Sequence, residues 1–512
     1  MIIYREQKRI LRTADVLESP RTSDADARRE LLIAFGELEC GVADLLPPGY
    51  PAVANLRRAA LEIGRAFVDP SRPLPDLRFD LPPSVEVGVP EGYAYYGLFP
   101  ETYVDATEKF FADARPRKCT VIGIRSIGTS LSAAVAGALL EQGVEVESFT
   151  VRPTGHPFHR ITHLGQPVDP GAFHLVVDEG PGLSGSSLGS VAEALHSAGV
   201  PDSHVIFFPS WQADPATLSS PMARDHFRRH RSYVGNFDLG FDPWIDLSAG
   251  QWRAFLGSPE IAVHPQHERR KFLSPDRKVL AKFAGFGSRG RQAFDRARIL
   301  HEAGFTPSPL NLSRGFLFTE FVPGCPMWGQ HPAGVPAPHL ATYLNYIRNN
   351  FRSPIPVPWN ALAEMLSTNL DEALHIDASP LLRVRPLIED APTHHLDGRM
   401  LPHEWIKTPS GILKADAVDH ADDHFFPGPQ DIAWDVAATI VEFALPDDFL
   451  RFFDTATRRR VPFYLIAYSV FRLAYCRMAE SSAPAEAERF RALARRYETV
   501  IRASPLLRIS SD

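Results

Sequence analysis

Two adjacent carboxylates, Asp178 and Glu179, follow the apolar run at 173–177 and precede a turn rich in glycine and serine. The run predicts a buried strand of a parallel sheet, and the acid pair would then lie at the carboxyl edge, where α/β proteins bind ligands. Residues 184–187 read Ser-Gly-Ser-Ser and lead into a helical stretch. Amides at a helix N-terminus favour a phosphate, and carboxylates favour ribose hydroxyls or Mg²⁺. The segment therefore predicts a site for a phosphorylated sugar.

This segment resembles the 5-phosphoribosyl-1-pyrophosphate (PRPP) motif of type I phosphoribosyltransferases, which is an apolar strand, two acids, four variable residues and a phosphate loop. Glu179 stands where the family more often has a second Asp, and serines stand where it often has Thr. The resemblance implies that Asp178 and Glu179 grip the ribose hydroxyls and Mg²⁺. The residues that it implies for the 5-phosphate are Gly182, Ser184, Gly185, Ser186 and Ser187. An ordinary strand–turn–helix unit that carries an acidic pair is the alternative.

Two upstream segments extend this resemblance over residues 85–245. Residues 120–143 read as a strand, a glycine-bearing loop and a small-residue helix, and residues 144–160 read as a strand and a polar loop. In the family the first loop binds pyrophosphate, and a basic residue after the second strand assists before a mobile hood. The candidates that this implies are Arg125, Ser126, Gly128 and Thr129 in the first segment and Arg152, His156 and Arg160 in the second. Arginine suits the task because its planar fork bridges phosphate oxygens, although each arginine alone also fits a solvated surface.

A lysine on a predicted strand, Lys282, begins a second pattern near residue 255. Two strand-like runs joined at Pro275-Asp276 are followed by a helical run at 291–305 and a strand that contains Glu320. This order resembles the N-lobe and hinge of aminoglycoside-phosphotransferase-like kinases. There the strand lysine holds the phosphates of ATP and pairs with an acid on the following helix. That acid would be Asp295 or Glu302, and Glu320 would lie beside the ATP site.

A later segment, residues 397–443, resembles the C-lobe of the same kinases. A short strand, GILKADA, ends at Asp416, and the sequence GPQDIAWDVA opens a helix. The resemblance implies that Asp416 or Asp419 binds Mg²⁺ and that Asp435 begins the helix. The catalytic loop departs from the family, which has Asn five residues after its Asp, because Pro402 stands five residues after Asp397. The catalytic base is then either Asp397 or Glu404, and phosphotransfer would be altered or absent.

A dense group of possible metal ligands occupies residues 416–424. Its members are Asp416, Asp419, His420, Asp422, Asp423 and His424. Such residues suit Zn²⁺ or Mn²⁺, so a metal-dependent hydrolase is an alternative for this region. A polar active-site loop of the kinase-like fold and a solvated acidic turn are the competing interpretations.

The elements that position these residues follow from periodicity. Residues 24–46 and 52–68 predict amphipathic helices, and a proline-rich stretch at 69–92 marks a boundary. Aromatic residues at 93–103 favour core packing, with Tyr95, Tyr96 and Tyr103 as alternative walls of an acceptor pocket. Residues 447–505 predict three helices.

We therefore expect an α/β multidomain protein: a helical cap with a linker at 1–84, a Rossmann-like parallel-sheet domain at 85–250 and a bilobal α+β kinase-like domain at 255–505.

Composition limits the classes of partner. The 512 residues carry a net charge of −7, which argues against a nucleic-acid binder, and the basic run at 224–231 favours a solvated helix face. The four cysteines have no metal or disulfide spacing, which fits a cytoplasmic protein. The N-terminus lacks the apolar core of a signal peptide, and no apolar run approaches the ~20 residues that span a bilayer, so we expect no membrane partner.

The sequence thus predicts PRPP-dependent phosphoribosyl transfer to a small-molecule acceptor with release of pyrophosphate. A nucleobase is the acceptor that the family implies. The kinase-like half would bind ATP and phosphorylate a small molecule. A regulatory protein that binds PRPP and nucleotides without turnover is the alternative for the whole chain.

Overall fold

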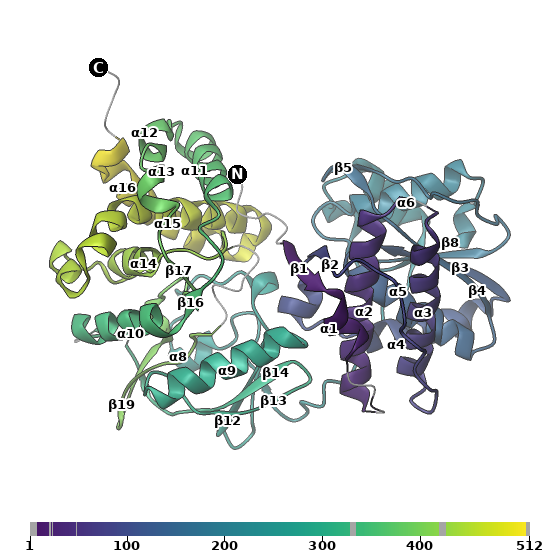
Figure 1. Ribbon diagram of the computed structural model, residues 1–512, viewed down its shortest axis with the longest axis horizontal. Helices are drawn as coiled ribbons and strands as arrows, with labels where there is room; N and C mark the ends of the chain where they lie inside the picture. Colours follow the sequence, from purple (N-terminus) through teal and green to yellow (C-terminus); the bar gives the residue numbers. More distant parts are fainter. Residues whose placement is uncertain are drawn as a thin grey trace. The chain divides into compact units, whose positions relative to one another are not determined.

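The computed structural model describes residues 8–19, 22, 24–47, 49–327, 334–418 and 426–507. The chain divides between Phe241 and Asp242 into two compact units, which we call the first unit and the second unit. Each unit combines helices with a sheet of its own, so the chain is a multidomain protein of mixed α/β structure (Figure 1).

A parallel sheet forms the centre of the first unit. Its strand order is β4-β3-β7-β8-β9, and every neighbouring pair is parallel. This is a doubly wound order, in which the chain moves outward from β3 first to one side and then to the other. The strands are β3 (Lys118–Ile124), β4 (Glu145–Val151), β7 (Phe173–Val177), β8 (Val205–Phe208) and β9 (Arg231–Ser232). The parallel sheet predicted from the apolar runs is confirmed.

Helices cover both faces of this sheet because right-handed crossovers in opposite directions place them so. The helix α5 (Ile127–Glu141) follows β3, and α6 (Ser186–Ser197) follows β7. Side chains of β3, β7 and β8 share a core with α6 and with α7 (Pro221–Arg229). The basic run at 224–231 lies mostly on α7, where Arg228 and Arg229 are exposed as a solvated face and His226 and Phe227 are buried on the inner side.

The N-terminal helices pack on α5. They are α2 (Ala25–Leu45) and α3 (Pro51–Val68), which confirms the two helices predicted there. A Cβ atom at Gly64 would lie 2.1 Å from the carbonyl oxygen of Ala133, and one at Gly137 would lie 2.4 Å from the carbonyl carbon of Gly64. The two glycines therefore let α3 and α5 approach backbone to backbone.

The remaining elements of the first unit are short or peripheral. Strands β1 (Lys8–Arg12) and β2 (Ser84–Gly88) pair antiparallel, and β5 (Thr154–His156) pairs with β6 (His159–Ile161) in a hairpin. The other helical segments are α1 (Thr13–Leu17), η1 (Gly92–Tyr96), α4 (Pro100–Ala114), η2 (Asp202–His204) and η3 (Pro215–Thr217).

The second unit begins with an antiparallel sheet of order β10-β11-β12-β14-β13. Its strands are β10 (Ile245–Asp246), β11 (Lys271–Leu273), β12 (Val279–Phe283), β13 (Pro309–Ser313) and β14 (Phe316–Glu320). The helix α9 (Ser288–Glu302) joins β12 to β13. A smaller sheet follows, made of β15 (Cys325–Pro326), β18 (Trp405–Thr408) and β19 (Gly411–Lys414).

Helices form the rest of the second unit around one large apolar core. Its centre is α15 (Thr455–Ser482), packed against α11 (Trp359–Leu374), α14 (Ala433–Phe443) and α16 (Ala487–Ala503). Other elements include α10 (Ala337–Asn350) and the short α8 (Arg253–Leu256), β16 (Arg352–Ser353), α12 (Ser379–Leu382), α13 (Arg385–Ile388) and β17 (Thr393–His394). Among the described residues, no helix has both the length and the apolar character required to cross a membrane.

Candidate active sites

The carboxyl ends of β3 and β7 meet where the strand order of the first unit reverses, the usual ligand site of an open α/β sheet. The loop after β3 enters α5 at Ile127, and the loop after β7 enters α6 at Ser186. A Cβ atom at Gly128 would lie 2.6 Å from the carbonyl oxygen of Val177, so glycine is needed for the first loop to contact the end of β7. The topology thus brings the two predicted ligand loops together.

The acid pair is held by contacts to its backbone and by one amide. The Tyr103 hydroxyl donates to the carbonyl oxygen of Asp178 at 2.7 Å, and the Ser210 amide donates to that of Glu179 at 3.1 Å. Glu179 Oε2 accepts a hydrogen bond from the Gly92 amide at 3.0 Å. Tyr103 is therefore buried support for the acid pair and not the wall of an acceptor pocket; Tyr95 is buried as well.

Both carboxyls are poised to lose a proton near neutral pH. Burial raises the pKa of Asp178 to about 7 and that of Glu179 to about 8, the latter with a contribution from the neighbouring charge of Glu91. In the described part of the chain, neither carboxylate forms an ion pair with a lysine or arginine. Two half-buried acids without such a partner are a place where a bound cation would be stabilised.

The two arginines of the predicted pyrophosphate site lie together but contact an internal carboxylate. Arg125 Nη1 lies 3.1 Å from Asp44 Oδ1, and Arg152 Nη2 contacts Asp44 Oδ2. Arg152 Nη1 also donates to the carbonyl oxygen of Arg125 at 2.9 Å. Burial alone would raise the pKa of Asp44, but hydrogen bonds and charge from Arg152 and Arg125 lower it. Asp44, near the end of α2, was not among the residues predicted from sequence.

The serine loop is covered by the turn of the β5–β6 hairpin. Ser184 Oγ donates to the carbonyl oxygen of Pro157 at 3.0 Å, and Ser186 Oγ donates to the same oxygen. Gly185 has φ 67°, a left-handed conformation that glycine adopts readily and that begins α6. The predicted hood and the predicted phosphate loop are therefore in direct contact.

The other predicted residues of the first unit differ in accessibility. Ser126 has φ 113° at the start of α5, a strained backbone for a non-glycine residue. Thr129 is fully buried, and its carbonyl oxygen accepts from Arg57 at 3.0 Å, so its side chain is part of the core. His156 is exposed, and Arg160 Nη1 donates to the carbonyl oxygen of Gly155 at 2.9 Å within the hairpin.

The second unit contains a cavity of about 490 Å³. Its walls include Lys282 on β12, Glu320 at the end of β14, the following segment 321–324, Glu404 and Asp416. This volume lies within the ~300–1,000 Å³ range of small-molecule and cofactor sites. The cavity therefore collects residues from both halves of the predicted kinase-like region.

Lys282 forms its ion pair with Asp416, at 2.6 Å and 2.7 Å from the two carboxylate oxygens. The resemblance to the kinases predicts instead a partner acid on the following helix. Asp295 is exposed on α9, and Glu302 pairs with Arg298 on the same helix at 2.8 Å. Asp416 is the partner of Lys282 in place of those acids, because β19 ends beside the large sheet that contains Lys282 on β12.

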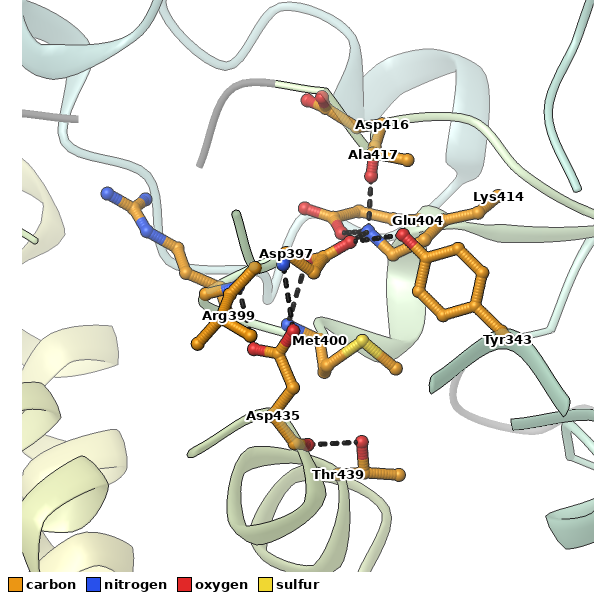
Figure 2. A network of polar contacts seen from close by, with 12 residues as sticks. Tyr343, Asp397, Arg399, Met400, Glu404, Lys414, Asp416, Ala417, Asp435 and Thr439 are labelled. Atoms are coloured by element: carbon orange, nitrogen blue, oxygen red, sulfur yellow. Dashed lines mark hydrogen bonds and ion pairs between the residues drawn. The ribbon is translucent and has the colours of Figure 1, made fainter. Parts of the chain in front are cut away.

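A buried lysine, Lys414, contacts both Asp397 and Glu404, the two residues that the sequence offers as catalytic base. Lys414 Nζ lies 2.9 Å from Asp397 Oδ2 and 2.6 Å from Glu404 Oε2, and its side chain is 0 % exposed (Figure 2). Tyr343 donates from its hydroxyl to Asp397 Oδ2 at 2.9 Å. Burial opposes the charge on Lys414, but the nearby carboxylates raise its pKa overall.

Asp435 fixes the backbone of the loop that carries Asp397. Asp435 accepts from the amides of Asp397 and Gly398, both at 2.8 Å (Figure 2). Burial raises the pKa of Asp435 to about 7, and the charge of Asp397 adds to the effect. Asp435, on α14, is thus a positioning residue for the loop that leads from Asp397 to Glu404.

The hairpin of β18 and β19 explains why Glu404 and Asp416 approach each other. Trp405 pairs with Lys414 at the open end of the hairpin, and the Ala415 amide donates to the carbonyl oxygen of Glu404 at 2.7 Å. Both acids therefore flank the same open end. The remaining residues of the predicted metal cluster, Asp419, His420, Asp422, Asp423 and His424, lie outside the described residues.

No protein-family model matches the chain, and no curated protein sequence matches it. Solved structures that are similar include phosphotransferases. A choline/ethanolamine kinase family protein from Mesorhizobium loti is 13% identical, with 46% of this chain and 89% of that chain covered and a TM-score of 0.25. An ethanolamine kinase from Plasmodium vivax is 13% identical, with 47% and 80% covered and a TM-score of 0.32.

A macrolide 2'-phosphotransferase from Brachybacterium faecium is 12% identical, with 48% of this chain and 90% of that chain covered and a TM-score of 0.29. Structural similarity at this level carries no argument about function. The chemistry of this chain follows from its own contacts.

Proposed function

We propose that the second unit is a phosphotransferase that uses ATP and Mg²⁺ to phosphorylate a small molecule. The observation that carries this proposal is the cavity lined by Lys282, by its ion-pair partner Asp416 and by Glu404. A cavity lined by a lysine and two carboxylates suits a nucleoside triphosphate with its divalent cation. The lysine matches the negative phosphates, and the carboxylates match the cation.

Each residue then has a defined task. Lys282 would turn from Asp416 to the phosphates of ATP, and the segment 321–324 would border the base. Asp416 offers carboxylate oxygens of the kind that Mg²⁺ prefers. The ion neutralises charge on the phosphates when bound. Phosphoryl transfer depends mainly on positioning and charge stabilisation, so this set needs no strongly activated nucleophile.

Glu404 is the better placed of the two candidate bases. It lines the cavity, whereas Asp397 is 1 % exposed and accepts hydrogen bonds from Tyr343 and Met400. We therefore assign Asp397 to positioning: it holds Lys414, and Lys414 in turn holds the Glu404 carboxylate.

The test compares two single-charge variants of the full-length chain. Asp416→Asn removes an acid from the cavity, and Asp371→Asn removes an exposed acid from α11 as the matched control. We expect calorimetric affinity for ATP with Mg²⁺ to fall at least about 10-fold in Asp416→Asn only. Equal affinities in the two variants, or no binding by the wild type, would refute the proposal. Binding without transfer from γ-labelled ATP to any acceptor of a small-molecule panel would instead support a nucleotide-binding regulator.

A second function is favoured for the first unit, namely binding and transfer of the phosphoribosyl group of PRPP. It is supported by two half-buried acids without a basic ion-pair partner in the described chain, next to a serine-lined helix start at the reversal point of the sheet. Asp178 and Glu179 would hold the ribose and Mg²⁺, and Ser184 and Ser186 would exchange the Pro157 carbonyl for the 5-phosphate. Arg125 and Arg152 would exchange Asp44 for pyrophosphate.

The same acids provide the test. Glu179→Gln is expected to abolish calorimetric binding of PRPP with Mg²⁺, whereas Glu108→Gln, an exposed acid on α4, keeps it. Pyrophosphate release with a panel of nucleobases then distinguishes a transferase from a regulatory binder. Unchanged PRPP affinity in Glu179→Gln would exclude this site as a PRPP cradle.

A further inference from the structure

Three histidines of the first unit direct ring nitrogens toward one another between α6 and α7. His196 lies near the end of α6, His226 lies on α7, and His230 directly follows α7. One ring nitrogen of each lies within 4.8 Å of those of the other two. His226 and His230 are 1 % and 6 % exposed, so the cluster is part of the interior.

Hydrogen bonds on the far sides of two rings determine their tautomers. His226 Nε2 lies 3.1 Å from Glu193 Oε2, and His230 Nδ1 lies 3.2 Å from the carbonyl oxygen of Asp202. A carbonyl oxygen and a carboxylate both accept, so these two nitrogens carry the protons. The remaining nitrogens, His226 Nδ1 and His230 Nε2, then face each other at 3.2 Å, each with a lone pair.

Two facing lone pairs are stabilised by a positive charge, which Arg229 provides at one side and which a metal ion between the rings would also provide. In a tetrahedral zinc site with Zn–N bonds of about 2.0–2.1 Å, two ligand nitrogens are about 3.3–3.4 Å apart. The separation of 3.2 Å between His226 and His230 is close to that value. His230, directly after α7, follows His226 by four residues, about one helical turn, so both rings lie on one side of the helix.

We propose that His196, His226 and His230 bind Zn²⁺, or another transition-metal dication of similar preference, through one nitrogen each. The fourth position would be open to water. This site is separate from both proposed active sites and does not depend on the function of either.

The surroundings support a metal in one respect and oppose it in another. Glu193 and Asp202 provide the carboxylate and carbonyl acceptors that commonly orient metal-binding imidazoles. His196 Nε2 also lies 2.9 Å from Asp202 Oδ1. Arg229 opposes a cation, because its Nη2 lies 3.4 Å from His226 Nδ1. The Arg229 side chain is 38% exposed and pairs with Asp225 at 3.0 Å, so it can turn outward.

A metal here would join the end of α6 to α7. Since α6 begins at the serine loop, the ion would brace the helix whose first turn is the proposed phosphate site. The expected effect is on stability: metal loading should raise the unfolding temperature of the first unit.

The experiment uses the full-length chain without a histidine tag. After loading with ZnCl₂ and gel filtration, we expect one zinc per chain by elemental analysis. His196→Gln should weaken zinc binding at least about 10-fold by chelator competition, whereas His163→Gln, an exposed histidine outside the cluster, should leave it unchanged. Arg229→Gln should tighten zinc binding, because it removes the competing cation.

X-ray absorption of the zinc-loaded wild type provides a readout that needs no variant. Three histidine nitrogens around zinc would support the site even if His196→Gln fails to fold. Substoichiometric zinc, a coordination shell without three histidines, or equal zinc affinity in His196→Gln and His163→Gln would overturn the proposal.

Discussion

Replacing Glu179 by glutamine should stabilise the ligand-free first unit at alkaline pH while it removes ligand binding. The Glu179 carboxyl has its pKa raised from the ordinary 4.5 to about 8, chiefly by burial. The folded chain therefore keeps a proton that the unfolded chain releases, and stability falls as pH rises from about 4.5 to about 8. At about 1.4 kcal/mol per pH unit, the full cost is about 5 kcal/mol above pH 8.

Glutamine avoids most of this cost because it carries no charge at any of these pH values. Its side-chain oxygen can still accept from the Gly92 amide, as Glu179 Oε2 does at 3.0 Å. Its amide group needs an acceptor, which costs about 1–3 kcal/mol if none is found. We therefore expect Glu179→Gln to be less stable than the wild type by about 0–2 kcal/mol near pH 5 and to exceed its stability by about 2–4 kcal/mol at pH 9.

Native-state hydrogen exchange, read by mass spectrometry on peptides from β3 and β7, measures this free energy within the first unit. Glu108→Gln should show no such pH-dependent gain. A Glu179→Gln stability difference that stays flat between pH 5 and pH 9, or that is negative at pH 9, would refute the argument that burial of this carboxyl is a cost retained for ligand binding.

Two further substitutions test the supports of the two sites. Lys414→Met leaves Asp397 and Glu404 as buried carboxylates without their shared cation. It should lower the free energy of unfolding in urea by about 3–5 kcal/mol, and a small loss of under ~1 kcal/mol would contradict the pairing. Gly92→Ala places a Cβ 2.8 Å from Glu179 Oε1. It should cost about 1–3 kcal/mol by the same hydrogen-exchange assay and weaken PRPP binding, and neutral behaviour on both counts would show that the contact is not close.

Local patterns were sufficient to predict most elements. The apolar runs before Asp178 and around 120–124 are strands, and the periodic segments at 24–46 and 52–68 are helices. A strand or helix that buries one face along its whole length has apolar residues at a regular spacing, and this spacing is visible in the sequence. Glycine and serine after a strand likewise indicate a turn into a helix, which begins at Ser186.

The spacing of residues in the sequence did not predict which distant residues contact each other. The expected partner of Lys282 was an acid on α9, but its partner is Asp416, which follows β19 and is 134 positions away in the sequence. Lys414 sits in an apolar-looking strand, and nothing local distinguishes a lysine buried between two acids from one exposed to water. Asp44, which contacts both predicted pyrophosphate arginines, belongs to a helix that was interpreted only as a cap.

The positions of two histidines in the sequence already indicated part of the histidine cluster. His226 and His230 are four residues apart within a basic run, a spacing that puts two imidazoles on one helix side. The positive charge of the run favoured a solvated face. Only the packing of α7 against α6 added His196 and turned that side inward.

The sequence by itself thus determined which segments become strands and helices and which loops carry acids, serines and lysines, because these depend on neighbours within one or two turns. Tertiary structure alone decided which charges face each other. The strand order of a sheet and the packing of helices bring together residues more than a hundred positions apart, and the energy of a buried charge depends on its surroundings in space.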